Sequence, residues 1–109
     1  KGGPVSRFVL CILAFCSVNV SLAFAGDVEA GKARYAQNCY ICHGPSGKGM
    51  ASYPKLAGKE ISYLVDRLER YRAEERFGPN SDLMIMNAMP LSDEEIANLA
   101  AYLNSAKIK

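Results

Sequence analysis

Cys39-Tyr40-Ile41-Cys42-His43 is the stretch that points to the fold, because Cys-x-x-Cys-His is the attachment signature of a c-type haem. Two thiols at this spacing can both bond to vinyl groups on one edge of the same porphyrin. The histidine that follows is then close enough to the ring to reach the iron as the proximal axial ligand. His43 is the only histidine of the sequence. Zinc sites with two histidines are therefore excluded, and no histidine is left for the opposite axial position.

A Cys-x-x-Cys pair also occurs in redox dithiols and in zinc sites. The redox dithiol usually begins a helix within a strand–helix–strand pattern, and this sequence shows no strand pattern. A structural zinc site needs four ligands, and a second Cys-x-x-Cys pair is missing. Both alternatives are weaker than haem attachment, which is the prediction.

Residues 1–25 have the features of a secretory signal peptide. Lys1 and Arg7 make a basic start, and Ala23-Phe24-Ala25 is a small-x-small cleavage site. The apolar run between them has about 13 residues, fewer than the roughly 20 that span a bilayer as a helix. An uncleaved membrane anchor is therefore the weaker alternative.

Residues 26–109 then form the mature domain, which we expect in the periplasm. The two other cysteines, Cys11 and Cys16, lie in the segment that is removed. Export agrees with the haem prediction, since bacterial c-type haem is attached on the outer side of the cytoplasmic membrane. A domain this small gains stability from a covalent cross-link or a bound metal, and one covalently attached haem c would supply it.

The charge of the mature domain gives no argument for nucleic-acid binding. The sequence has 13 Lys and Arg against 11 Asp and Glu. Two of the basic residues, Lys1 and Arg7, lie in the predicted signal peptide, whereas all the acidic residues lie in the mature part. The mature polypeptide is therefore formally neutral, without the basic surplus of a nucleic-acid-binding domain.

The mature sequence predicts helices only. Asp27 can cap a first helix that runs to about Cys39, in which Gly31 and Tyr35 share one face. Residues 44–49 contain three glycines and a proline, which predicts a loop beside the haem.

Two further helices follow, each with an apolar stripe. The second helix is expected to turn these residues toward the core or the haem: Ile61, Leu64, Val65, Leu68 and Tyr71. Its other face is expected to be a solvated surface of Asp66, Arg67, Glu69, Arg70 and Arg72. The last helix begins at the capping box Ser92-Asp93-Glu94-Glu95, and its stripe is Ile96, Leu99, Ala100 and Leu103.

The order of these segments resembles a class I c-type cytochrome. The resemblance rests on the haem motif, on Tyr53-Pro54-Lys55-Leu56-Ala57-Gly58, on a methionine-containing loop, and on the sequence from Leu91 to Leu103. More narrowly, the chain is similar to bacterial cytochrome c-553 and to either half of the dihaem cytochrome c4, over nearly all of residues 27–105.

This resemblance implies an all-α fold with three main helices around one covalently bound haem. The first and last helices would cross near a haem edge, with Gly31 and Tyr35 against Leu99 and Tyr102. The Pro54 carbonyl would accept a hydrogen bond from the His43 ring, which orients the ligand and raises its basicity.

The resemblance also implies that a methionine sulfur from the loop before the last helix is the distal axial ligand. Met84 has the spacing to the Ser92 cap that the family commonly uses, and is favoured. Met86 stays open because Met86-Asn87-Ala88 resembles a common sequence at the ligand position. Met89 stays open because Met89-Pro90 resembles the Met-Pro pair of other subgroups. Met50 follows the haem motif too closely and is expected to pack in the loop or at the haem edge.

The function that the resemblance implies is one-electron transfer by an iron with both axial positions filled, and not enzymatic catalysis. The expected partners are periplasmic redox proteins, or a membrane oxidase or dehydrogenase, which dock transiently on a monomer. Lys48, Lys55 and Lys59 are expected to surround the exposed haem edge. One alternative is the haem subunit of a periplasmic dehydrogenase or other oxidoreductase complex. Another is a sensor or peroxidase with a labile distal ligand.

Overall fold

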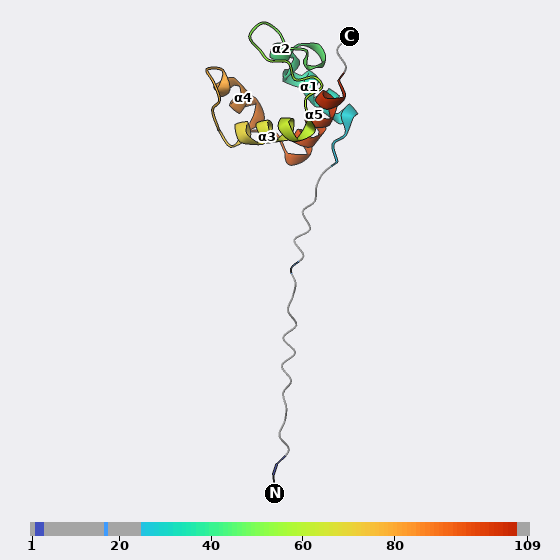
Figure 1. Cartoon of the computed structure of the whole chain (residues 1–109), viewed down its shortest axis with the longest axis vertical. Coiled ribbons are helices and arrows are strands. Elements are labelled where there is room, and N and C mark those ends of the chain that lie inside the picture. Colours follow the sequence, from blue (N-terminus) through green and yellow to red (C-terminus); the bar gives the residue numbers. More distant parts are fainter. Residues whose placement is uncertain (1, 4–16, 18–24, 107–109) are drawn as a thin grey trace.

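The computed structural model describes residues 2–3, 17 and 25–106 (Figure 1). The described residues form five α-helices and one short 3-10 turn: α1 Val28–Asn38, α2 Tyr40–His43, η1 Pro45–Gly47, α3 Ile61–Arg72, α4 Ser81–Ala88 and α5 Asp93–Ser105. Their only β pairing is an isolated bridge between Met50 and Tyr53. The all-α prediction is therefore confirmed for this part of the chain. The predicted signal peptide lies almost entirely outside the described residues.

Helix α1 begins at the predicted cap and crosses α5. The Asp27 side chain accepts a hydrogen bond of 3.0 Å from the Ala30 N–H. A Cβ built on Gly31 would lie 1.9 Å from the backbone oxygen of Asn98, so this crossing requires glycine. One turn later, the ring centroids of Tyr35 and Tyr102 lie 5.4 Å apart. The contact between the first and last helices is therefore as the resemblance implied.

Helix α5 begins with the predicted capping box. The Glu95 N–H donates to Ser92 Oγ at 3.1 Å, and the Ser92 N–H donates back to Glu95 Oε1 at 3.2 Å. The apolar stripe of this helix is Ile96, Leu99, Ala100 and Leu103. It is buried in one cluster with Tyr35 of α1, Leu64 of α3, Ala88 of α4 and Leu91 of the loop before α5. Burial of this stripe holds α5 against α1 and α3.

Helix α3 departs from the prediction at its first and last residues. Ile61, its first residue, is 47% exposed, because the helix begins before it reaches the core. Arg72 was expected on a solvated face, yet its guanidinium donates to the Leu91 carbonyl at 3.1 Å and pairs with Asp93 at 2.7 Å. These contacts tie the end of α3 to the start of α5.

Helix α4 is the largest departure, since the sequence predicted a loop there. Residues 81–88 read Ser-Asp-Leu-Met-Ile-Met-Asn-Ala, and leucine, methionine and alanine are good helix formers. The apolar residues Ile85 and Ala88 are buried, which stabilises the helix against α3. Met84 therefore lies on a helix, and its direction is set by helical geometry.

Candidate functional site

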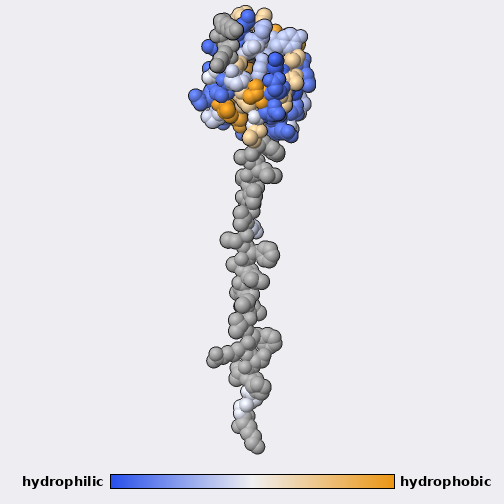
Figure 2. Space-filling model, turned by 90° about the vertical axis from the view of Figure 1, so that its right-hand side faces the viewer, coloured by the Kyte–Doolittle hydropathy of each residue, from blue (hydrophilic) through white to orange (hydrophobic). Residues whose placement is uncertain are grey.

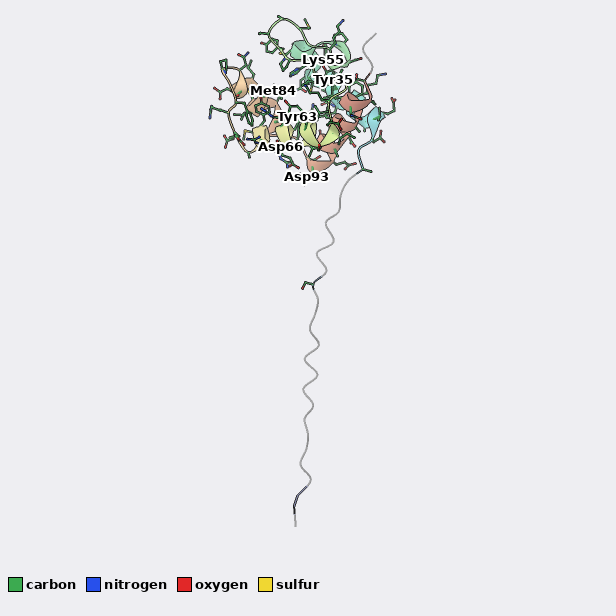
Figure 3. The ribbon with its side chains drawn as sticks, viewed as in Figure 1. Tyr35, Lys55, Tyr63, Asp66, Met84 and Asp93 are labelled. Carbon is green, nitrogen blue, oxygen red and sulfur yellow. The ribbon has the colours of Figure 1, made fainter. Side chains whose placement is uncertain are left out.

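A cavity of about 480 Å³ opens between the helices and the loop before α3. This volume lies in the usual range for small-molecule and cofactor sites. Its lining is mainly apolar and includes Tyr35, Leu56, Leu64, Leu68, Leu99 and Leu103. Figure 3 shows Tyr35, Tyr63 and Met84 approaching this region from three different helices. The cavity is therefore shaped for a largely apolar group.

The haem motif forms one wall of this cavity. Cys39 joins α1 to α2, and Cys42 and His43 are the last residues of α2. The backbone N–H of His43 donates to the Cys39 carbonyl at 3.1 Å, so the motif is a single helical turn. Residues three apart on such a turn lie on the same side, and both free thiols line the cavity together with His43. Burial raises the pKa of the Cys39 thiol.

The His43 side chain is 7% exposed and its orientation is defined by the loop that follows. Its Nδ1 lies 3.0 Å from the Pro54 carbonyl oxygen. A carbonyl only accepts, so Nδ1 carries the proton and Nε2 keeps the lone pair that a metal needs. The loop itself is held by the Gly49 N–H, which donates to the His43 carbonyl at 2.7 Å.

Met84 is the one methionine among the residues that line the cavity. It is half-buried on α4, on the same face as Leu83, Asn87 and Ala88, which also line the cavity. Met86 lies on the opposite face and is 66% exposed, and Met89 is 53% exposed. Helical periodicity thus separates Met84 from its two rivals.

Met50 does not line the cavity either. Its side chain is 48% exposed, and its Cγ would lie 3.1 Å from a Cβ built on Gly44. It packs in the loop, beside the glycine that follows His43.

The buried Tyr35 hydroxyl forms a hydrogen bond with the same glycine, Gly44. It donates to the Gly44 carbonyl at 2.6 Å, and the side chain is only 3% exposed. Burial is the main reason that the pKa of Tyr35 is raised from 10.0 to about 12, with the neighbouring Cys39 thiol adding to it. The fold therefore favours the neutral phenol at this position.

Stability should consequently fall at high pH in a way that depends on Tyr35. A raised pKa means that this contribution is complete below about pH 10 and is lost as the pH rises through about 12. We expect Tyr35→Phe to lower the free energy of unfolding by about 1 kcal/mol at neutral pH, the usual value of a hydrogen bond. The variant should also lose less stability than the wild type as the pH rises between these two values. Denaturant unfolding across this range measures both effects. Tyr40→Phe is the control, since Tyr40 is 48% exposed, and an equal flattening there would contradict the assignment.

Arg67 belongs to the cavity and not to a solvated face, so the prediction for it is wrong. It lines the cavity, and its guanidinium carbon lies 4.0 Å from the Phe77 ring centroid and 5.6 Å from that of Tyr63. Arg67 forms no ion pair with the described residues. The spacing in the sequence could have indicated this position. Arg67 follows Leu64, a residue of the predicted apolar stripe, by three residues, and residues three apart are neighbours on a helix surface. Its charge suits a cofactor that carries carboxylates.

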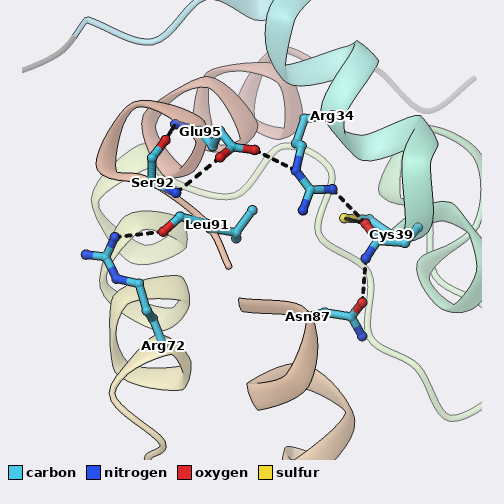
Figure 4. A network of polar contacts seen from close by, with 8 residues as sticks. Arg34, Cys39, Arg72, Asn87, Leu91, Ser92 and Glu95 are labelled. Atoms are coloured by element: carbon cyan, nitrogen blue, oxygen red, sulfur yellow. Dashed lines mark hydrogen bonds and ion pairs between the residues drawn. The ribbon is translucent and has the colours of Figure 1, made fainter. Parts of the chain in front are cut away.

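A polar network closes the cavity on the side of Cys39 (Figure 4). The Arg34 side chain pairs with Glu95 at 2.7 Å and donates to Asn38 Oδ1 at 2.8 Å. Asn38 in turn donates to Asn87 Oδ1 on α4. Hydrogen bonds from the Ser92 backbone and from Arg34 lower the pKa of the Glu95 carboxyl. Sequence reasoning missed the links between helices, from Arg34 to Glu95 and from Asn38 to Asn87, because single polar residues far apart in the chain form no motif.

The three lysines expected around the cavity are exposed, and the Lys59 side chain makes a cation–π contact with a cavity residue. Its Nζ lies 5.3 Å from the ring centroid of Tyr63, which lines the cavity. Lys55 follows Pro54, another lining residue. On the face that Figure 2 shows, hydrophobic residues lie in small groups between hydrophilic ones. No helix in the described part of the chain is long and apolar enough to cross a membrane.

Comparison with known proteins gives one consistent result. The family model described as Cytochrome c matches residues 28–107. Cytochrome c-554(548) of Halomonas halodenitrificans is 44% identical over 74% of this chain and 98% of its own length. Cytochrome c4 of Thiocapsa roseopersicina is 41% identical over 71% of this chain, which spans only 38% of that protein. The solved structure of Acidithiobacillus ferrooxidans cytochrome c4 superimposes with a TM-score of 0.67 at 28% identity, covering 78% of this chain and 52% of that one.

Proposed function

The chain belongs to the cytochrome c family, and from this premise we propose that it carries single electrons in the periplasm, with His43 and Met84 as the axial ligands of its haem. Family membership makes it a haem electron carrier, and not an enzyme, with one covalently bound haem c. The observation that supports the ligand pair is the position of Met84, on the wall of the same cavity as Cys39, Cys42 and His43.

The residues present suit this cofactor. Cys39 and Cys42 would hold one edge of the ring through thioether bonds, and Met84 would supply a soft sulfur ligand from α4. The Nδ1–H···O contact with Pro54 would fix the tautomer and orientation of His43. When bound, the haem supplies one-electron exchange between ferric and ferrous iron. The apolar lining would exclude water, and His43 and Met84 together would leave no open position at the iron for a substrate.

A redox titration of the purified holoprotein tests this function. A reversible one-electron couple should accompany a thioether-to-iron charge-transfer band in the oxidised form, and carbon monoxide should not bind the reduced form. An absent band together with rapid binding of carbon monoxide would instead support a sensor or peroxidase.

The haem subunit of an oxidoreductase complex is a second candidate. A protein of Stutzerimonas stutzeri named Thiosulfate dehydrogenase electron acceptor is 38% identical over 78% of this chain and 38% of its own length. We propose the free carrier first, because cytochromes c-554 and c4 match equally well or better. Recovery of the native protein in a stable complex with a larger subunit would reverse this order.

The periplasmic location rests on the sequence pattern of residues 1–25. Attachment of haem to Cys39 and Cys42 outside the cytoplasmic membrane is consistent with it. The expected partners in that compartment are periplasmic redox proteins or a membrane oxidase or dehydrogenase, which dock on the carrier transiently.

Docking of an anionic partner should depend on the exposed lysines near the cavity. We expect the rate of oxidation by ferricyanide, a small anionic probe, to fall as salt rises, since charges beyond roughly 10 Å are screened at 0.1 M. Lys55→Glu should slow this reaction at low salt. Lys32→Glu is the matched control, because Lys32 is also exposed but lies on α1 with no lining residue beside it in the sequence. Lys55, in contrast, lies between the lining residues Pro54 and Leu56. Equal rates for the two variants, or no salt dependence, would show that these lysines only solvate a loop.

A further inference from the structure

Ser81 is a buried polar residue at the first position of α4. Its side chain is 4% exposed, and its Oγ accepts two backbone hydrogen bonds, from the Phe77 N–H at 2.7 Å and the Gly78 N–H at 2.9 Å. The residue at the cap position of this helix, Asn80, makes no side-chain capping bond. The start of α4 is therefore fixed to the preceding loop through the Ser81 side chain.

This anchor acts on the helix that carries Met84. Helix α4 has eight residues, little more than two turns, and so short a helix is not stable by itself. Ser81 and Met84 are three residues apart and both line the cavity, so they lie on the same face of the first turn. At the other end of the helix, Asn87 is joined to Asn38. The place of the Met84 sulfur depends on how firmly these two ends are held.

We propose that Ser81 is a positioning residue for the axial methionine. The proposal rests on ligation of the iron by Met84. Without the Ser81 hydroxyl, the N–H groups of the half-buried Phe77 and the exposed Gly78 lose their acceptor inside the protein. The loop then relaxes and the first turn of α4 loosens. Met84 is then held less firmly at its ligating position, so an external ligand displaces its sulfur more easily.

The test is the affinity of the oxidised holoprotein for imidazole, which must displace Met84 to reach the iron. We expect Ser81→Ala to raise this affinity about fivefold to tenfold, the change in an equilibrium that the loss of one or two such hydrogen bonds produces. The charge-transfer band should weaken at the same time. Ser81→Thr keeps the acceptor oxygen and should restore most of the wild-type affinity.

Ser105→Ala is the matched control. The Ser105 hydroxyl donates to the Tyr102 carbonyl at 2.8 Å near the end of α5, and Ser105 is exposed and does not line the cavity. Loss of this hydroxyl should leave the imidazole affinity unchanged. Equal affinities in Ser81→Ala, Ser105→Ala and the wild type would overturn the proposal.

Met84→Ala separates failure of this proposal from failure of the ligand assignment. If Met84→Ala keeps the charge-transfer band, Met84 is not the ligand, and both the ligand assignment and the proposed role of Ser81 are wrong. If Met84→Ala loses the band while Ser81→Ala has the imidazole affinity of the wild type, only the proposed role of Ser81 is wrong. Should Ser81→Ala give no holoprotein, Ser81→Cys replaces it, because a thiol is a weaker acceptor of similar size. A smaller rise in imidazole affinity supports the proposal, and no rise overturns it.

Discussion

Met84→Ala is expected to lower the reduction potential by a few tenths of a volt, since axial ligands set haem potentials across roughly 0.8 V. The thioether favours ferrous iron, and its loss leaves water or another weak ligand in that position. The opened position should also let the reduced protein bind carbon monoxide. A redox titration and a carbon monoxide difference spectrum measure the two effects.

The other methionines supply the controls for this change. Met86 and Met89 are 66% and 53% exposed on α4 and just beyond its end. Substitutions at such surface positions usually change stability by about 0.5 kcal/mol or less. Their alanine variants should keep the wild-type potential, and a fall in potential for either of them would contradict the assignment of Met84.

Replacing both Cys39 and Cys42 with alanine is expected to abolish covalent haem attachment. Each single variant should retain at most one thioether bond and give a reduced yield of holoprotein. The cavity is largely apolar and the domain is small, so a chain without the ring has lost much of its core. Mass spectrometry of the purified protein reports the mass added by haem.

Cys11→Ala and Cys16→Ala are the matched cysteine controls for that experiment. If the signal peptide is cleaved after Ala25, both variants should give the same mature mass and haem content as the wild type. The same spectra give the N-terminus. An N-terminus before Gly26 would show that the signal-peptide prediction is wrong. A wild-type mass without the haem increment would contradict haem attachment itself.

The caps and helix stripes could be predicted from the sequence because they depend on neighbouring residues. Asp27 and Ala30, or Ser92 and Glu95, are three residues apart, and short-range hydrogen bonds fix such helix starts. The crossing of α1 and α5 came from a family resemblance, and the steric need for glycine at position 31 became visible only in three dimensions.

The features that the sequence left open depend on tertiary contacts. Helix α4 is too short to be stable by its own propensity, and its formation depends on burial of Ile85 and Ala88. Spacing along the chain supported Met84 while a local triplet supported Met86, and only the helix face distinguishes their environments. Arg67 lies at the edge of an apolar stripe, where pattern alone assigns a charged residue to solvent.

The charge-transfer band of the oxidised protein, compared in Met84→Ala, Met86→Ala and Met89→Ala, tests the proposed site most directly. The band reports a thioether bound to ferric iron, so it identifies the ligand without reference to a partner. We predict that it disappears in Met84→Ala and persists in the other two variants. A band that survives in Met84→Ala and disappears in Met86→Ala or Met89→Ala would contradict this assignment, and survival in all three would point to Met50.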